Sequence, residues 1–256
     1  LISSRRLDAY LEILESAPRA LKHRQAVRFH TGTSERVGMP LLLDAEELTP
    51  GASGYVQFFL REPLALKPGD RFVIRSFSPA FTWGGGIILH VNPPRHKRRQ
   101  AAVLEGLKVL EQGSPEDQLS FYLAEAGPAG RSRGELEALL PWDAGELKRL
   151  LDKLASQGRI LLFDPENQRY LLTATAQELE AQVRDQLTSY HRQNPLKPGL
   201  SKEELRRKLP AAMEVRLFNY LLAGLANKKQ VAVEKDLVRL MSHKITLAGD
   251  QEDVTR

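Results

Sequence analysis

The chain has 256 residues, of which 42% are hydrophobic, and a formal net charge of +5 at neutral pH. This length predicts two or three domains, and every apolar run falls far short of the ~18 to 20 residues that cross a bilayer. Cysteine is absent, which excludes disulfides, thiolate metal sites and cysteine nucleophiles. We expect a cytoplasmic protein with no membrane contact, and the positive charge favours an acidic partner such as RNA.

The charge is spread unevenly along the chain. Residues 113–174 contain more acidic than basic residues, whereas the segments before and after them carry a basic excess. The acidic segment would repel a phosphate backbone. The sequence begins at Leu1 with neither a methionine nor an export segment, and we therefore expect a piece of a longer protein.

Short strands and turns dominate residues 1–95. Leu7–Ile13 alternates with a period of two, as a half-buried strand does. Turns are marked at Pro50-Gly51 and Pro68-Gly69. Three consecutive glycines, 84–86, let one backbone pass close to another, as the corner of a barrel requires. Residues 1–95 are therefore predicted to form a small β-barrel.

From residue 96 onward the pattern becomes helical. A basic run opens a junction over residues 96–112, in which apolar residues then recur at helical spacing. Ser114 before Pro115 predicts a capped helix start. Four further helix starts are predicted where a residue with a capping oxygen stands three positions before a glutamate: Ser132, Asp143, Thr175 and Ser201.

A repeat divides the helical part into two units. An apolar stripe at spacing i, i+3, i+4, i+7 begins at Leu147, and a second begins at Phe218. Each stripe is followed by a polar break and a hairpin pattern, the second of which ends at Ile245–Leu247. Helices followed by a two-stranded wing are typical of a winged helix. We predict two in tandem, at 113–174 and 175–249, and a tail at 250–256.

Two stretches resemble the SelB-type selenocysteine-specific elongation factors. The first third of the chain, with the order His30-Thr31-Gly32-Thr33, Pro68 to Pro79, and Gly84 to Gly86, resembles the third domain of that family. That domain is a β-barrel similar to domain 3 of elongation factor Tu. Residues 191–206 resemble the opening of the family's second winged helix. The resemblance implies a multidomain β plus α fold, a translation-factor domain 3-like barrel followed by two tandem winged helices.

The resemblance also implies a function. The family delivers selenocysteinyl-tRNA to the ribosome at a recoded stop codon. Its GTPase domain, with GTP and magnesium, would lie outside this chain, as would the later winged helices that bind the messenger-RNA hairpin. The chain would then be a monomer that has no cofactor of its own and positions RNA and neighbouring domains.

Catalytic and metal sites have no support in the sequence. No phosphate-binding loop of the G-x-x-x-x-G-K-[ST] type occurs, and the three glycines lack dinucleotide-binding spacing. None of the six histidines belongs to an H-x-x-x-H or H-E-x-x-H array. We therefore predict neither catalytic nor metal-binding residues, and we expect a protein that is not itself an enzyme.

RNA contact is the remaining candidate for a site. Domain 3 of elongation factor Tu touches the T-arm of tRNA, so the resemblance implies a similar barrel surface, for which four residues lie near suitable turns: Arg28, His30, Arg36 and Arg71. The alternative for His30 is a half-buried barrel histidine hydrogen-bonded to backbone. A denser basic strip, with a solvated linker as its alternative, comprises Arg95, Lys97, Arg98 and Arg99.

The winged helices give a weaker signal for RNA. A reader of bases carries arginine, lysine, asparagine or glutamine on its third helix, but both third helices are close to neutral. We expect the two units to act mainly as a stiff spacer arm. The second unit has basic residues that either contact RNA or form a solvated face: Lys202, Arg206, Arg207, Lys208, Lys228 and Lys229. The competing hypothesis is a dimeric winged-helix DNA-binding transcription regulator fused to a small β domain.

Overall fold

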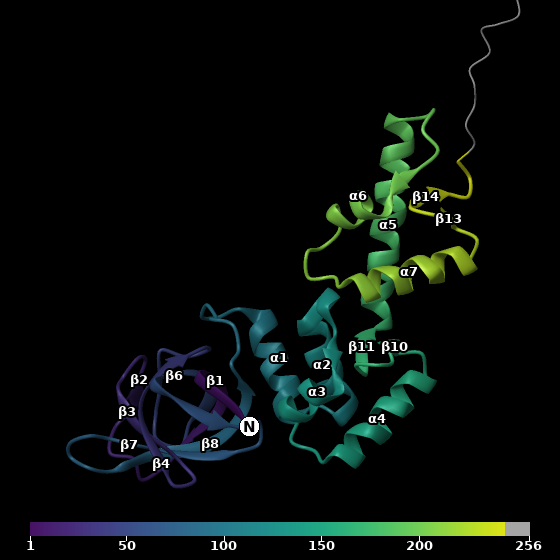
Figure 1. The fold of residues 1–256 in the computed structure, drawn as a ribbon. Helices are drawn as coiled ribbons and strands as arrows, with labels where there is room; N and C mark the ends of the chain where they lie inside the picture. The colour runs from purple at the N-terminus through teal and green to yellow at the C-terminus, as the bar shows by residue number, and fades with distance from the viewer. Residues whose placement is uncertain (244–256) are drawn as a thin grey trace, which may run out of the picture. The chain divides into compact units, whose positions relative to one another are not determined.

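The computed structural model describes residues 1–243 (Figure 1). These residues form two compact units, of which the first contains Leu1–Tyr122 and Arg133–Lys153, and the second contains Leu123–Ser132 and the chain from Leu154 onward. The predicted end of the second wing and the predicted tail lie outside the described residues. Within 1–243, no helix combines the length and the apolar character that crossing a bilayer requires.

The first unit contains a closed barrel of six antiparallel strands in the order β1-β6-β4-β3-β7-β8. The barrel strands are β1 (Ile2–Ile13), β3 (Val27–Thr31), β4 (Ser34–Leu42), β6 (Ser53–Leu66), β7 (Arg71–Arg75) and β8 (Thr82–Val91). A separate two-stranded ladder joins β2 (Leu21–Lys22) to β5 (Glu47–Leu48). The predicted β-barrel is confirmed.

Aromatic side chains fill the barrel. Phe29, Phe58 and Phe72 come from three different strands and form a ring cluster, with centroid distances of 4.9 to 5.4 Å. All three are buried, as is the large side chain of Trp83. Each of these rings removes a large apolar area from water, which is the main stabilising contribution to a core of this kind.

The three glycines of β8 lie against the backbones of the neighbouring strands. A Cβ atom on Gly84 would lie 1.9 Å from the carbonyl oxygen of Glu12, and one on Gly86 would lie 1.9 Å from that of Tyr10. A Cβ on Gly85 would meet the carbonyl oxygen of Phe72 at 2.5 Å. No side chain fits at these distances, so the predicted close backbone approach is confirmed.

Short strands alternate with helices after the barrel. The helical elements are α1 (Ala101–Gln112), α2 (Pro115–Ala126), η1 (Gly127–Ala129), α3 (Arg133–Leu139), α4 (Ala144–Ser156), α5 (Thr173–Gln193), α6 (Lys202–Arg207) and α7 (Val215–Asn227). The first wing is a three-stranded sheet of β9 (Arg131–Ser132), β10 (Ile160–Asp164) and β11 (Arg169–Leu172). The second consists of β12 (Leu200–Ser201), β13 (Val231–Glu234) and β14 (Leu237–Leu240). This order is that of a tandem winged-helix region, as predicted.

Three of the predicted helix caps form as expected. The backbone N–H of Asp117 donates to Ser114 Oγ at 3.2 Å, and that of Glu204 donates to Ser201 Oγ at 3.2 Å. Asp143 and Glu146 form a reciprocal capping box. These backbone hydrogen bonds to the carboxylate lower the pKa of Asp143.

The cap predicted at Thr175 is wrong. Helix α5 begins two residues earlier, at Thr173, and its N-cap residue Leu172 provides no side-chain hydrogen bond. Thr173 instead donates its hydroxyl hydrogen to the carbonyl oxygen of Gly158 at 2.6 Å. The hairpin preceding the helix therefore determines where it starts, a tertiary constraint that capping patterns do not report.

Helix α2 packs on the barrel within the first unit. The Tyr122 hydroxyl donates to the carbonyl oxygen of Leu89 at 3.1 Å, and the Tyr122 ring stacks on His90 with centroids 5.2 Å apart. Tyr122 is completely buried. Helix α1 is tied to the barrel by a hydrogen bond from Tyr55 to Glu111. The chain between barrel and winged helices is therefore packed rather than a free linker.

We predict that Gly86→Ala destabilises the barrel by about 3 kcal/mol or more, because the added methyl group overlaps a backbone oxygen and the strands must separate. Urea unfolding followed by the fluorescence of Trp83 and Trp142 measures the change. Gly134→Ala is the matched control, since a Cβ there meets nothing within 4 Å on a helix. We expect the control to be neutral or to gain up to ~1 kcal/mol. Equal stability of the two variants would contradict the close approach.

Candidate nucleic-acid interface

Residues 93–99, called the strap here, run over the outside of the barrel after β8. Beneath the strap, Asp8 of β1 faces Gln57 of β6 in register. Their neighbours Leu7, Ala9, Val56 and Phe58 point into the core, so Asp8 and Gln57 point outward. Both are nevertheless buried, with 1% and 0% of their surface exposed. The strap therefore covers two polar side chains on the outer barrel wall.

The strap satisfies these buried groups with hydrogen bonds. Gln57 Nε2 donates to Asp8 Oδ1 at 2.8 Å and to the carbonyl oxygen of Pro94 at 2.9 Å, while its Oε1 accepts from the His96 backbone at 3.2 Å. His96 Nε2 lies 2.7 Å from Asp8 Oδ2. A buried carboxylate without such partners would be strongly destabilising. This network fixes the position of the strap and the orientation of the His96 ring.

Two of the predicted strip arginines serve as anchors of the strap. Arg98 donates from Nε to the carbonyl oxygen of Leu42 at 3.0 Å and from an Nη to that of Ala45 at 2.7 Å. Arg98 and Arg99 both pair with Glu46, at 3.0 and 2.8 Å. The hydrogen bond from Arg98 is the main cause of the lowered pKa of Glu46. Arg98 is therefore packed against the barrel, whereas Arg95, Lys97 and Arg99 are exposed, as the solvated-linker alternative expects.

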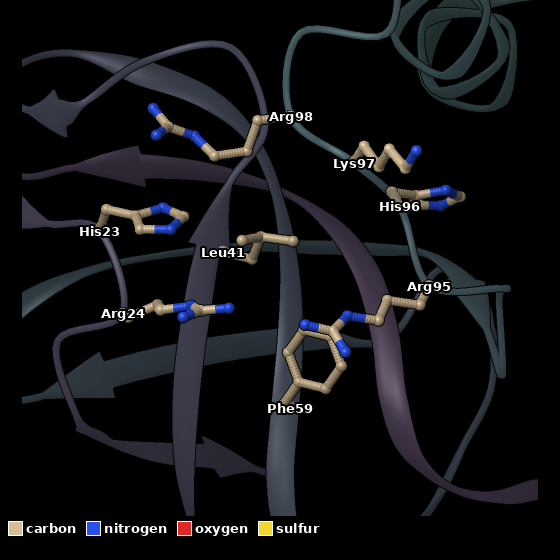
Figure 2. Close-up of a pocket in the computed structure, with 8 residues that line it drawn as sticks. All are labelled: His23, Arg24, Leu41, Phe59, Arg95, His96, Lys97 and Arg98. Carbon is tan, nitrogen blue, oxygen red and sulfur yellow. The ribbon is translucent and has the colours of Figure 1, made fainter.

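A groove of about 680 Å³, here called the basic groove, opens between the strap and the barrel (Figure 2). It is lined by His23, Arg24, Leu41, Phe59, Arg95, His96, Lys97 and Arg98. Six of the eight side chains are basic or histidine, and Figure 2 shows them arranged around Leu41 and Phe59. The groove combines positive charge with an apolar patch.

Histidine 23 is a neutral member of the groove. Its Nδ1 accepts a hydrogen bond from the backbone N–H of Leu42 at 3.3 Å, which places the ring proton on Nε2. Burial is the first cause that lowers the pKa of His23, and the charges of Arg98 and Arg24 add to it. His23 therefore provides a hydrogen-bond donor at neutral pH rather than a charge.

The barrel residues predicted to contact RNA fall on two faces. Arg28 and His30 of β3 point outward, and the register pairs them with Arg75 and Val73 of β7. Because alternate residues of β7 share a face, Arg71 lies on the same outer surface. Arg36 is the register partner of Phe29, which points into the barrel, so Arg36 lies on the inner side of β4. Its Nε lies 3.4 Å from Glu62 Oε2. The structure thus brings together three of the four residues and separates Arg36.

Arg28 and His30 both interact with Glu35. Arg28 lies 3.1 Å from this carboxylate and also over the exposed ring of Phe77, 5.3 Å from its centroid. His30 Nδ1 lies 3.8 Å from Glu35, and its buried Nε2 has no hydrogen-bond partner within residues 1–243. The ring therefore does not make the backbone hydrogen bond proposed as the alternative for His30.

A second hollow on the barrel has the opposite charge. It has a volume of about 800 Å³, and its lining includes Glu12, Glu15, Glu111 and a single arginine, Arg71. Three carboxylates against one guanidinium would repel a phosphate. Of the two hollows, the basic groove is the one suited to an anion.

Three of the six basic residues predicted in the second unit are engaged in local contacts. Lys228 pairs with Glu180 at 2.7 Å and Arg207 with Glu203 at 2.5 Å, while Lys208 lies over the ring of Tyr190 at 5.8 Å. Arg206 and Lys229 are exposed and Lys202 is half-buried. The set does not converge on a pocket in the part of the chain that the structure describes.

Sequence reasoning did not find several residues of the groove and of the barrel wall beneath the strap. Asp8 and Gln57 sit at outward positions of strands and read as solvated, because only the strap, remote in sequence, buries them. His23 and Arg24 lie in a loop without a recognisable motif. The only available signal was the basic run itself, which pointed to the strap but not to the barrel wall that it faces.

Comparison with known proteins identifies the family. The model of the β-barrel domain of selenocysteine-specific elongation factors matches residues 8–95, and that of the second winged helix of elongation factor SelB matches residues 184–240. A selenocysteine-specific elongation factor from Desulfomicrobium baculatum is 33% identical over 95% of this chain. The chain belongs to the SelB family. The resemblance predicted from the sequence is confirmed.

This chain spans little more than a third of the length of these relatives. It covers 38% of the Desulfomicrobium baculatum protein, and 37% and 35% of the selenocysteine-specific elongation factors of Haemophilus influenzae and Escherichia coli, to each of which it is 24% identical. A crystal structure of bacterial selenocysteine-specific elongation factor EF-Sec matches 93% of this chain and 34% of that one, with a TM-score of 0.65 at 20% identity. That match supports the fold.

We predict that Gln57→Leu loosens the strap, because leucine removes the side-chain partner of Asp8 Oδ1, of the Pro94 carbonyl oxygen and of the His96 amide. The expected destabilisation is about 2 to 4 kcal/mol, from two or more unsatisfied buried groups. Hydrogen exchange of the His96 amide should accelerate in this variant. Gln182→Leu, an exposed position on α5, should change stability by less than ~0.5 kcal/mol. Unchanged protection of the His96 amide in Gln57→Leu would contradict the role of the network.

We further predict that the first unit loses stability as the pH falls below 6.5, the ordinary pKa of histidine. The pKa of His23 is lower in the folded chain, so the unfolded state takes up the proton first. The stability that neutral His23 contributes to the folded state is therefore fully present above pH 6.5. It is lost as the pH falls towards the pKa of His23 in the folded chain. His23→Asn keeps an acceptor near the position of Nδ1 without titrating and should flatten the dependence. Identical slopes in urea titrations from pH 7 to 5 would refute this.

Proposed function

We propose that this chain is the part of a selenocysteine-specific elongation factor that holds selenocysteinyl-tRNA on its barrel while the factor delivers it to the ribosome at a recoded stop codon. The family membership supports this function. The observation that carries it to particular residues is the strand register, which gathers Arg28, His30, Arg71 and Arg75 on one outer face of β3 and β7. Clustered cations on a rigid sheet suit contact with a phosphate backbone.

The structure of the second unit supports the proposal that the winged helices act as a stiff spacer arm. Helix α5 is continuous over 21 residues, which at ~1.5 Å per residue gives a rod of about 30 Å. One apolar core runs from the first wing, through Phe163 and Leu171, to Leu217 and Phe218 of α7. Arg216 of α7 also pairs with Asp164 of the first wing at 2.7 Å. A shared core and an ion pair to the buried Asp164 carboxylate resist bending, so the unit can act as a stiff spacer.

Other properties of the factor follow from the family alone. GTP and magnesium would bind to a GTPase domain, and no residue of this chain would take part in that chemistry. The messenger-RNA hairpin would bind to further winged helices, and the working location would be the cytoplasm. The chain itself would act as a monomer that binds and positions its partners.

A duplex-DNA regulator is the second candidate. A winged-helix regulator would present free cations on its third helix, but Arg216 of α7 is engaged with Asp164 and Glu166, each at 2.7 Å. Hydrogen bonds to the Glu166 carboxylate, and then to that of Asp164, raise the pKa of Arg216. Strong duplex-DNA binding in a gel shift at physiological salt would favour the regulator.

We predict that Arg75→Ala weakens binding of selenocysteine tRNA to this chain several-fold. It should also lower the slope of log affinity against log salt by about 1, since one phosphate contact is lost. Filter binding over a salt titration measures both values. Lys148→Ala removes the same charge from an exposed residue of α4 and should leave affinity and slope unchanged. Equal effects in the two variants would count against the outer barrel face.

A further inference from the structure

The basic groove differs from the outer barrel face in having an apolar floor. Leu41 and the half-buried ring of Phe59 lie among its cations (Figure 2). A surface that binds only phosphates does not need an aromatic ring. Base stacking on aromatic side chains, combined with nearby cations, is the usual way in which proteins bind single-stranded nucleic acid.

Three cations of the groove have no acidic partner. Within residues 1–243, Arg24, Arg95 and Lys97 form no ion pair, and all three are exposed. The lining contains no carboxylate. Arg98 and His96, by contrast, are held by Glu46 and Asp8. The groove thus presents three available charges on a wall fixed by the other two residues, which is the preorganisation that a binding site requires.

Arg24 keeps a backbone conformation that disfavours its side chain. Its φ is +58°, in the left-handed region that glycine occupies without strain. The backbone N–H of Arg24 donates to the carbonyl oxygen of Pro40 at 2.8 Å, so the turn is fixed. Strained residues of this kind cluster at functional sites. A need for a guanidinium in the groove would explain why arginine occupies a backbone conformation in which glycine would make the fold more stable.

We propose that the basic groove binds one unpaired nucleotide of an RNA strand. The base lies against Phe59 and Leu41, and the adjoining phosphates lie among Arg24, Arg95 and Lys97. A volume of about 680 Å³ falls in the range of small-molecule sites. A duplex offers only its backbone and would leave the apolar floor unused. This inference rests on the proposed function only in taking RNA as the partner.

The test measures binding of a fluorescein-labelled RNA pentanucleotide to the 256-residue chain, by anisotropy at physiological salt. Arg24→Gly should weaken binding at least tenfold and at the same time raise the unfolding midpoint, because the strain is relieved. Phe59→Leu keeps an apolar side chain but removes the stacking ring, and should weaken binding at least fivefold. Lys148→Ala, which removes an equal charge elsewhere, should have no effect.

Three outcomes would each contradict nucleotide binding in the basic groove. The first is an unchanged pentanucleotide affinity in Arg24→Gly, and the second is equal or tighter binding of the same sequence as a duplex with no effect of Phe59→Leu. The third is displacement of the RNA by an acidic peptide at a lower concentration than that of the RNA. If Arg24→Gly proves less stable than the parent, Lys97→Ala provides the same test at an exposed position and should weaken binding at least threefold.

The result is separable from the proposed function. Arg75→Ala should reduce tRNA binding and leave pentanucleotide binding unchanged. Binding of the pentanucleotide through Arg24 and Phe59 without binding of tRNA would refute the proposed function and support nucleotide binding in the basic groove. Tight tRNA binding without pentanucleotide binding would support the proposed function and refute nucleotide binding in the groove.

Discussion

The hydrogen bonds that the strap makes to Asp8 and Gln57 are the interaction on which the first unit depends. A carboxylate and an amide stand side by side on the outer wall of a barrel, where they would normally be solvated. The strap buries both, and this is tolerable only because Pro94 and His96 supply partners at hydrogen-bond distance. The basic groove exists because this network holds the strap in place.

The basic run of the strap consequently has two kinds of member. Arg98 donates to backbone carbonyl oxygens of the barrel and pairs with Glu46, so its charge serves the fold. Arg95 and Lys97 face the groove without an acidic partner within residues 1–243. Net charge alone treats these residues as equivalent. A structural guanidinium is already neutralised by its partners, whereas an unpaired one remains available to a phosphate.

The second unit uses a different constraint. The first wing and the second winged helix share one apolar core, and α5 contributes Leu179, Val183 and Leu187 to it along its length. A buried carboxylate, Asp164, is matched by Asn167 and Arg216, which lower its pKa, the hydrogen bond from Asn167 being the largest cause. Packing and ion pairing thus join the first wing to the last helix. This continuity is the observation behind the spacer role proposed above.

The sequence by itself determined the barrel, the tandem winged helices and most helix starts, because hydrophobic periodicity, turn residues and caps are local signals. Its resemblance to SelB-type factors indicated the family. It also marked the strap as basic. Only the tertiary structure decided which of these charges are available, that Arg36 faces away from Arg28, that α5 starts at Thr173, and that Asp8 is buried. Those outcomes depend on partners distant in the chain, such as the strap over β1 and β6. A local pattern carries no information about which remote segment will cover it.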